Sequence, residues 1–255
     1  MRLERAADPH VARVQWDALI AMLEKECGAT FERVAPAAGL PDMVFTANAG
    51  VVTGRSVILS RFRCPERRPE EEQFARWFEA QSYAVVRLPR ELFFEGAGDL
   101  LSGREVWFGG HGQRSDIRAY RYLGSLEGRD IIPLELVDPR FYHLDVALTV
   151  LDETRDHIAY FPAAFSRSSR RLLAETFPDA ITATSADAHA FGLNCVSDGR
   201  HVFVPAGAHQ LREALVTAGY RPTSVDLSEL IKGGGSVKCC TQEIRPAPIH
   251  DHDQP

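Results

Sequence analysis

The chain has 255 residues, of which 45% are hydrophobic and 25% are charged, a composition typical of a soluble globular protein with a well-buried core. A formal net charge of −6 leaves no broad basic surface, which argues against a dedicated binder of nucleic acid or of anionic membranes. The N-terminal residues lack an apolar stretch, and nowhere do about 18 consecutive apolar residues occur, so we expect a cytoplasmic protein with no membrane partner.

Helix-like and strand-like periodicities alternate along the chain, which predicts an α/β fold in a single domain over residues 1–255. In the first half we expect a helix over 12–26, strands over 43–50 and 56–62, a helix over 69–81 and a strand over 83–89. In the second half we expect strands over 105–110, 130–136, 146–152, 157–162 and 201–207, helices near 166–176 and 208–219, and a frayed polar tail over 245–255. A Rossmann-type sheet is disfavoured, because neither GxGxxG nor GxxxxGK[ST] occurs.

The five cysteines are Cys27, Cys64, Cys195, Cys239 and Cys240, an odd number that indicates reduced thiols rather than a disulfide framework. No CxxC pair and no HxxxH spacing occur, so we expect no metal site. Cys27 and Cys195 lie in apolar sequence surroundings, where a buried and unreactive thiol is common. Cys239 follows a run of three glycines, which permits close approach of the backbone to a ligand, and this context favours a nucleophile.

Four short segments place polar residues inside apolar surroundings, where they are costly to bury without a purpose. The segments are LPDMVFTANAG (40–50), FFEGAGD (93–99), YHLDVAL (142–148) and GGGSVKCCTQEI (233–244). Taken singly they decide little, because Glu95 could end a strand and His143 could be a hydrogen-bonded core histidine. His143 and Asp145 alternate on a strand-like segment, so on an extended backbone they would share one face.

Together and in this order, LPDMVFTAN, FEGAGD, YHLD and GGGSVKC resemble the motifs of the guanidino-group-modifying superfamily. This superfamily includes arginine deiminase, dimethylarginine dimethylaminohydrolase, agmatine deiminase, succinylarginine dihydrolase and the amidinotransferases. The resemblance extends from about Leu40 to Ile244. It implies the α/β-propeller of the superfamily, the pentein fold, in which five pseudo-symmetric ββαβ modules surround a central funnel.

The resemblance also implies catalytic roles for the residues that match the motifs. Cys239 takes the position of the nucleophile, although the adjacent Cys240 leaves a choice between the two thiols. His143 takes the position of the general acid/base, and Asp145 that of the group that orients its imidazole. Glu95 takes the position of the carboxylate that binds the guanidinium, whose planar set of donors suits such an acceptor.

Substrate-binding residues are implied in the same way. Asn48 takes the remaining position at the guanidinium, and Asp42 and Phe45 belong to the same motif. The α-carboxylate of an arginine-type substrate calls for a basic residue at the mouth of the funnel. We favour Arg114 for this contact over the alternatives in the segment SRFRCPERR, which are Arg63 and Arg67.

These roles predict a hydrolase of arginine or an arginine derivative that forms a covalent thiouronium adduct on Cys239 and needs neither metal nor organic cofactor. Asn48 stands where the deiminases and many dimethylarginine hydrolases have aspartate, and the TAN segment resembles the dihydrolases, which convert arginine to ornithine, carbon dioxide and ammonia. Dimethylarginine hydrolysis to citrulline and an amine is the alternative. An amidinotransferase or a non-catalytic arginine-binding module is less favoured. The expected partner is a small arginine-like molecule, and a homo-oligomer is left open.

Overall fold

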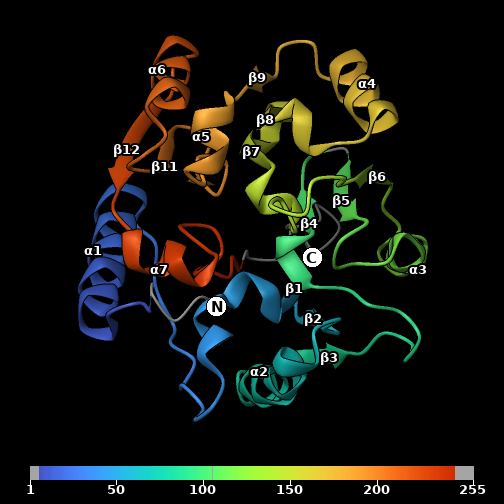
Figure 1. The fold of residues 1–255 in the computed structure, drawn as a ribbon. Coiled ribbons are helices and arrows are strands. Elements are labelled where there is room, and N and C mark those ends of the chain that lie inside the picture. The colour runs from blue at the N-terminus through green and yellow to red at the C-terminus, as the bar shows by residue number, and fades with distance from the viewer. Residues whose placement is uncertain (1–5, 105, 245–255) are drawn as a thin grey trace, which may run out of the picture.

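Four ββαβ modules are arranged in a ring in the computed structural model, which describes residues 6–104 and 106–244 (Figure 1). In each module an antiparallel hairpin is followed by a helix and by a third strand, which pairs in parallel with the second strand of the hairpin. A helix is the usual crossover between two parallel strands. The α/β class expected from the alternating periodicities is confirmed.

The bounds of the elements follow the chain. The first module contains β1 (Gly50–Thr53), β2 (Ser56–Leu59), α2 (Arg68–Ala80) and β3 (Ala84–Val86). The second contains β4 (Leu100–Ser102), β5 (Trp107–His111), α3 (Ile117–Glu127) and β6 (Ile131–Glu135). The third contains β7 (Leu148–Asp152), β8 (His157–Tyr160), α4 (Arg167–Thr176) and β9 (Ile181–Thr182). The fourth contains β10 (Val196–Ser197), β11 (His201–Pro205), α6 (His209–Thr217) and β12 (Arg221–Val225), and α5 (Ser185–His189) precedes it.

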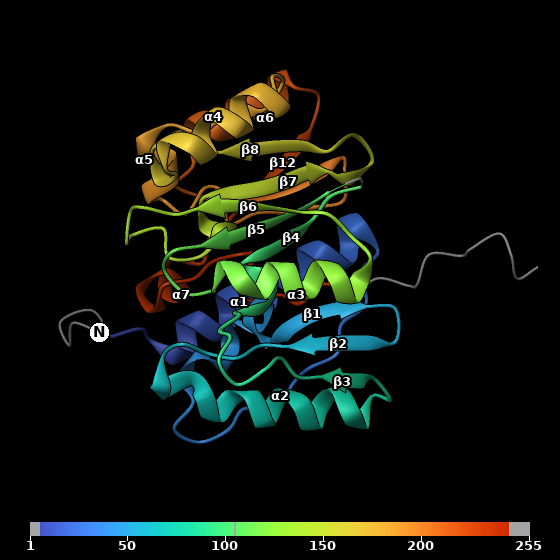
Figure 2. The ribbon, with the colours of Figure 1, turned by 90° about the vertical axis from the view of Figure 1, so that its right-hand side faces the viewer.

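The module helices cover the outside of the strands, as Figure 2 shows for α2 at the bottom and for α4 and α6 at the top. In α2 the buried residues Phe74 and Phe78 pack in one cluster with Val57 and Leu59 of β2. Burying a phenylalanine side chain of this kind stabilises the fold by about 1.5–3 kcal/mol. The apolar helix faces therefore hold each module together from the outside and leave the inner loops for polar groups.

Helices α1 (Pro9–Cys27) and α7 (Ser228–Gly233) lie side by side between the fourth module and the first (Figure 1). Gln15 joins them, because its amide nitrogen donates to the hydroxyl of Ser228 at 2.8 Å and its oxygen accepts the N–H of Glu229 at 3.0 Å. These helices fill the position in the ring where a fifth ββαβ module was expected. Within residues 6–104 and 106–244 no strand accompanies them.

The segment 43–50, for which we expected a strand, forms short 3-10 turns over Pro41–Val44 and Thr46–Ala49 instead, and only Gly50 begins β1. The backbone N–H of Ala47 donates to the carbonyl of Cys239 at 3.0 Å, so the segment pairs with the loop of the predicted nucleophile and not with a strand.

The expectation of an extended backbone across His143 and Asp145 was also wrong. Residues Leu144–Val146 form a 3-10 turn, and only His143 itself is extended. The two side chains therefore do not alternate along one strand.

Helix α3 was missed, because Gly124 interrupts its sequence pattern. A Cβ at Gly124 would lie 2.9 Å from the carbonyl oxygen of Arg129, so the close turn after α3 requires this glycine. The pattern also missed the helices α5 and α7 and the strands β4, β9, β10 and β12.

Two expectations fall partly or wholly outside the described residues. Residue 105 begins the strand expected over 105–110 and is not described, although β5 follows at Trp107. The tail expected over 245–255 lies outside them entirely. In the part of the chain that is described, no helix is long and apolar enough to cross a membrane.

Candidate active site

Short 3-10 turns immediately before the first strands of three modules meet at the centre of the ring. They are Thr46–Ala49 before β1, Gly96–Gly98 before β4 and Leu144–Val146 before β7. Glu95 and His143 directly precede the second and third of these turns, and Cys239 lies in the loop after α7. The pseudo-symmetry of the fold thus brings residues from distant motifs together, and all of these polar side chains are buried.

Cys239 lies in a buried polar setting formed by two side chains. Its Sγ donates to Oδ2 of Asp145 at 3.3 Å and accepts from Nδ2 of Asn194 at 3.1 Å. The oxygen of the same Asn194 amide accepts the backbone N–H groups of Cys239 and Ser236, both at 3.1 Å, and so fixes the loop. A Cβ at Gly235 would lie 2.8 Å from Cβ of Cys239, which explains why this loop needs a glycine.

Burial raises the pKa of the Cys239 thiol well above its ordinary value, and the nearby charge of Asp145 raises it further. A thiol in an uncharged state is therefore favoured at neutral pH while no cationic ligand is present. The adjacent Cys240 is buried too, and burial raises its pKa to about 12.

His143 pairs with Glu95. Its Nε2 lies 2.7 Å from Oε2 of Glu95, and Nη1 of Arg114 lies 3.1 Å from the same oxygen. Oε1 of Glu95 accepts the backbone N–H of Arg63 at 3.0 Å. Because Glu95 is fully buried, all three contacts compensate for the loss of water around its charge.

The charges of this pair stabilise each other. Burial opposes the charge of Glu95, but the hydrogen bond and charge of His143, with help from Arg114, lower the pKa of Glu95 to about 2. Burial likewise opposes the imidazolium, but the carboxylates of Asp99, Glu95 and Asp145 outweigh it and raise the pKa of His143 above its ordinary value. In its resting state the site therefore favours an ionised Glu95 and a protonated His143.

Asp145 does not hold His143 in the way expected from the resemblance. No hydrogen bond joins the two side chains among the described residues, and Nε2 of the His143 imidazole pairs with Glu95 instead. Oδ1 of Asp145 is buried and has no hydrogen-bond partner within residues 6–104 and 106–244, and burial raises the pKa of this carboxyl group. An unpartnered carboxylate oxygen beside a thiol is an acceptor that a cationic ligand could satisfy.

Asn48 links Glu95 to a second buried ion pair. Its Nδ2 donates to the backbone carbonyl of Glu95 at 2.9 Å, and its Oδ1 accepts from Nη1 of Arg67 at 2.9 Å. Arg67 also pairs with Glu70 at 2.8 Å. A Cβ at Gly98 would lie 2.3 Å from Nδ2 of Asn48 and 3.4 Å from Nδ1 of the His143 ring, so the absence of a side chain at 98 lets the amide lie close to the histidine.

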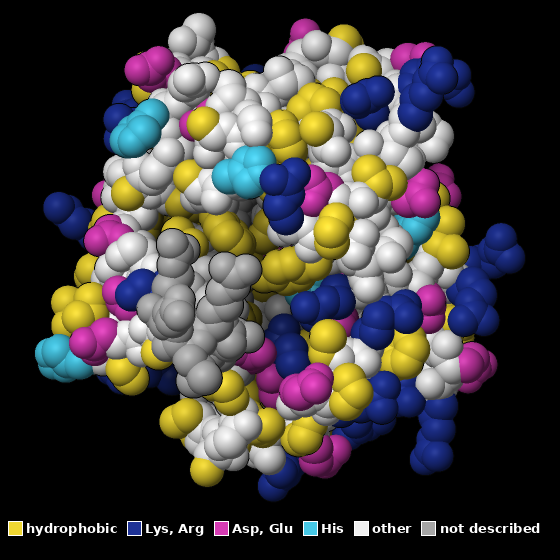
Figure 3. Space-filling model, in the orientation of Figure 1, with side chains coloured by type: hydrophobic (Ala, Val, Ile, Leu, Met, Phe, Trp, Pro, Cys, Tyr) yellow, Lys and Arg dark blue, Asp and Glu magenta, His cyan; other side chains and the backbone are white. Residues whose placement is uncertain are grey.

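The other expected substrate residues surround this centre. The guanidinium of Arg114 lies 4.9 Å from the ring centroid of Tyr142 and contacts Glu95, so it is already paired in the ligand-free protein. Phe45 packs against Gly235 in the loop of Cys239, and the backbone carbonyl of Asp42 accepts from Arg67 at 3.2 Å. On the face drawn in Figure 3, basic and acidic side chains gather around a hollow near the middle.

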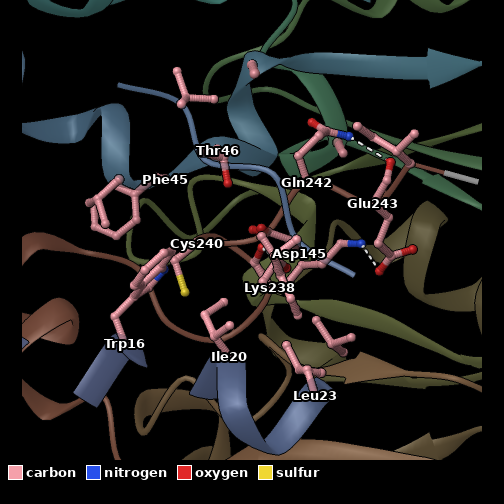
Figure 4. Close-up of a pocket in the computed structure, with 18 of the residues that line it drawn as sticks. Trp16, Ile20, Leu23, Phe45, Thr46, Asp145, Lys238, Cys240, Gln242 and Glu243 are labelled. Atoms are coloured by element: carbon pink, nitrogen blue, oxygen red, sulfur yellow. Dashed lines mark hydrogen bonds and ion pairs between the residues drawn. The ribbon is translucent and has the colours of Figure 1, made fainter. Parts of the chain in front are cut away.

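A cavity of about 2080 Å³ lies beside this centre. It is bordered by Trp16 and Ile20 of α1, by Phe45 and by Asp145 and Cys240, which lie around it in Figure 4. The three residues Cys239, His143 and Glu95 are not among those that line it. Asp145 therefore lies between this cavity and the thiol of Cys239, while Cys240 belongs to the cavity.

The sequence profile of the family described as N,N dimethylarginine dimethylhydrolase, eukaryotic, matches residues 3–246. The chain belongs to this family. A relative from Mycobacterium tuberculosis, an N(G),N(G)-dimethylarginine dimethylaminohydrolase, is 46% identical over 247 residues, which cover 96% of this chain and 80% of the relative. The bifunctional arginine dihydrolase/ornithine cyclodeaminase ArgZ from Synechocystis sp. is 39% identical over 235 residues, which cover 90% of this chain but 33% of ArgZ.

Solved structures agree with this membership. The N-terminal domain of ArgZ, as a cysteine-to-serine mutant bound to substrate, has a TM-score of 0.89 at 36% identity and covers 94% of this chain and 89% of that domain. A dimethylarginine dimethylaminohydrolase adduct with 4-chloro-2-hydroxymethylpyridine has a TM-score of 0.74 at 26% identity and covers 92% of this chain and 91% of that one. The expected superfamily and its propeller fold are confirmed.

Two further residues of this dimethylarginine hydrolase family member were missed from the sequence. Asn194 holds the Cys239 loop but lies in no motif. Its only signal in the sequence is that it is a polar amide between apolar neighbours. Asp99 was part of the FFEGAGD motif, and it accepts from the hydroxyl of Ser115 at 2.6 Å and from the backbone N–H of Leu144 at 3.0 Å. Asp99 thereby joins the turn after Glu95 to the turn after His143.

The choice between the two adjacent thiols can be tested by substitution. Cys239→Ser should lower turnover roughly a thousandfold or more, because a serine hydroxyl at neutral pH is a far weaker nucleophile than a thiolate. Cys240→Ser should keep most of the activity, since that thiol lines the cavity and contacts neither Asp145 nor Asn194 in the hydrogen bonds described. Steady-state rates and the intact mass of trapped adducts measure both. An adduct on Cys240 would contradict the assignment.

The raised pKa of Cys239 predicts a particular pH dependence for the ligand-free enzyme. Alkylation by iodoacetamide requires the thiolate, so its rate at Cys239 should rise about tenfold per pH unit and continue to rise past pH ~8.5, the ordinary value for a thiol. Peptide mass spectrometry of samples quenched between pH 6 and 10 gives the rate at each cysteine. A plateau below neutral pH would mean a preformed thiolate and would refute the assigned direction.

Proposed function

We propose that the protein is an arginine dihydrolase, a cysteine-dependent hydrolase that removes the two terminal nitrogens of the guanidino group as ammonia in two steps. The observation that carries this proposal is the arrangement around Cys239. A buried thiol lies against a carboxylate with one unused oxygen, Asp145, within a centre that also holds the protonated His143 and the ionised Glu95. Such a centre suits a planar cation whose carbon is attacked by sulfur and whose nitrogen must be protonated on departure.

Relatives support the chemistry. The N-terminal domain of ArgZ is described as an arginine dihydrolase and has been solved with substrate, with product and, in an asparagine-to-serine variant, covalently bonded to a reaction intermediate. At 36% identity and a TM-score of 0.89 over 94% of this chain, that domain supports the same type of reaction here. The cyclodeaminase activity named for the bifunctional relatives is not part of the proposal, because the chain matches about a third of their length.

In the first step the guanidinium enters the centre and donates to the free oxygen of Asp145. The added positive charge lowers the pKa of the Cys239 thiol, which loses its proton to solvent and attacks the guanidino carbon. His143 then donates its proton to the departing nitrogen, and the C–N bond breaks. Ammonia is released, and a thiouronium remains bound to Cys239. The neutral imidazole formed in this way is ready to act as a base.

The adduct is cleaved by water. His143 takes a proton from the water, whose oxygen attacks the thiouronium carbon. The C–S bond then breaks while the proton of the new hydroxyl group passes to the leaving sulfur, which releases a neutral ureido compound and the Cys239 thiol. Glu95 holds the imidazole in place and stabilises its positive charge whenever the proton is on it. The proton lost at the start is recovered on ammonia as ammonium, so one water is consumed and neither metal nor cofactor takes part.

A second hydrolysis requires the neutral ureido product to bind in the same place. Asn48 uses one N–H on the carbonyl of Glu95 and one lone pair on Arg67, which leaves a second N–H and a second lone pair on its amide. Asp145 has a raised pKa, so in its protonated form it can donate to a ureido oxygen where its ionised form accepts from a guanidinium. These two groups support the dihydrolase over a single-step hydrolase.

Hydrolysis of dimethylarginine to citrulline and an amine is the second candidate. The family match and the 46% identity to the relative from Mycobacterium tuberculosis favour it. It uses the same adduct and ends after one hydrolysis. A homo-oligomer and a cytoplasmic location accompany either activity as expectations.

The variant Asn48→Asp separates the two candidates. A carboxylate at position 48 would face the ureido oxygen of citrulline without a shared proton, and an unpaired buried contact of this kind costs on the order of 1–3 kcal/mol. That corresponds to roughly a tenfold to hundredfold slower second step. The variant should hydrolyse arginine once and release citrulline, whereas the wild type should carry arginine on to ornithine. Asn48→Ala serves as the matched control, because it removes the amide without adding a charge.

Product analysis decides the outcome. The protein is incubated with arginine, citrulline, monomethylarginine, dimethylarginine and agmatine, and citrulline, ornithine and the amines are separated by chromatography. If the wild type accumulates citrulline and leaves added citrulline unconsumed, the dihydrolase proposal is wrong and dimethylarginine hydrolysis takes its place.

A further inference from the structure

Three potential metal ligands from distant parts of the sequence meet away from the catalytic centre. Cys27 is the last residue of α1, Asp198 lies in the turn between β10 and β11, and His201 is the first residue of β11. One ligand atom from each side chain, the sulfur, a carboxylate oxygen and an imidazole nitrogen, lies within 4.8 Å of the other two. Cys27 and Asp198 also line the cavity of about 2080 Å³, which Asp145 borders as well but which Cys239, His143 and Glu95 do not line.

The turn holds the carboxylate and the imidazole in place before any metal binds. Oδ1 of Asp198 accepts the backbone N–H groups of Arg200 at 2.8 Å and of His201 at 2.6 Å. Oδ2 of Asp198 lies 2.9 Å from Nδ1 of His201. Gly199, at a φ of +88°, provides the left-handed residue that this turn needs. Two of the three ligands are therefore pre-organised by the backbone of a single hairpin.

The third ligand is positioned by the packing of α1. Leu19 and Leu23 of this helix are buried in the main core, and the helix ends in a left-handed Gly28 whose N–H bonds back to Glu24 at 3.1 Å. Cys27 therefore approaches the hairpin from a fixed helix end.

We propose that Cys27, Asp198 and His201 form a zinc site that fastens the end of α1 to the fourth module. A thiolate, an imidazole and a carboxylate together are the ligand set that Zn²⁺ prefers, whereas Mg²⁺ and Ca²⁺ take oxygen ligands. Water completes the tetrahedron, because the side chains of His201 and Asp198 keep 20% and 34% of their surface exposed. Binding replaces the thiol proton of Cys27, which is released to solvent, and a small contraction brings the three atoms to coordination distance.

A metal at this place acts on stability and not on chemistry. It would join a helix near the beginning of the chain to a hairpin near its end, and a ligand that binds only the folded state raises the midpoint of thermal unfolding. None of the three ligands takes part in the proposed hydrolysis, so occupancy should leave the catalytic rate unchanged.

Titration of the metal-free protein with Co²⁺, a spectroscopic substitute for Zn²⁺, tests the proposal. The wild type should bind one equivalent with a thiolate-to-cobalt charge-transfer band and the visible bands of tetrahedral cobalt. Cys27→Ser should lose the charge-transfer band, and both Cys27→Ser and Asp198→Asn should bind at least about tenfold more weakly. Cys64→Ser is the matched control and should behave as the wild type. Cys239→Ser should retain the signal, since a signal lost only in that variant would place the metal in the catalytic centre and overturn the proposal.

The midpoint of thermal unfolding provides a second measurement, which does not depend on the cobalt spectrum. Zn²⁺ should raise the thermal midpoint of the wild type and of Cys64→Ser, but not that of Cys27→Ser. Cys27→Ser should turn over substrate at the wild-type rate, which shows that it is folded and that the catalytic centre is intact. A zinc-dependent shift that persists undiminished in Cys27→Ser, or no shift in the wild type, would contradict the site.

Discussion

The buried ion pair of Glu95 and His143 is the interaction on which the candidate active site depends. An ionised carboxylate without exposure to water is stable only when cations and hydrogen-bond donors surround it. His143, Arg114 and the backbone N–H of Arg63 supply them, and each comes from a different part of the chain. Once they are buried, the carboxylate and the imidazolium are stable only while the inner turns of the modules hold these partners around them, so the site depends on closure of the ring.

The sequence predicted the members of the site better than their contacts. Cys239, His143, Glu95 and Asn48 stand in motifs whose order identified the superfamily, but spacing along a chain does not say which side chain faces which. Asp145 is two residues from His143 and was expected to hold it, yet the 3-10 turn between them directs its carboxylate to the thiol instead. The partner of the imidazole, Glu95, comes from another module.

Secondary structure was likewise predicted where it depends on nearby residues and missed where it depends on distant contacts. Helices α1 and α2 were predicted from periodicity because their buried faces repeat at helical spacing. The prediction of a strand over 43–50 was wrong because this segment forms turns that hydrogen-bond to the Cys239 loop. That contact joins residues that are far apart in the sequence. Asn194 and the cluster of Cys27, Asp198 and His201 had no motif at all, since their neighbours are set by the closing of the ring and not by the sequence around them.

The pairing of Arg114 with Glu95 means that the resting centre already holds a guanidinium. An incoming substrate presents a guanidinium, the same group that Arg114 already supplies to Glu95. The guanidinium of the substrate alone should therefore bind Glu95 little more tightly than Arg114 does. Discrimination between arginine and small guanidines must then rest on the remainder of the molecule, its chain length and its carboxylate. Under the proposed function, a ligand guanidinium that bound at Glu95 would have to displace Arg114, so binding there would depend on additional contacts made by the rest of the ligand.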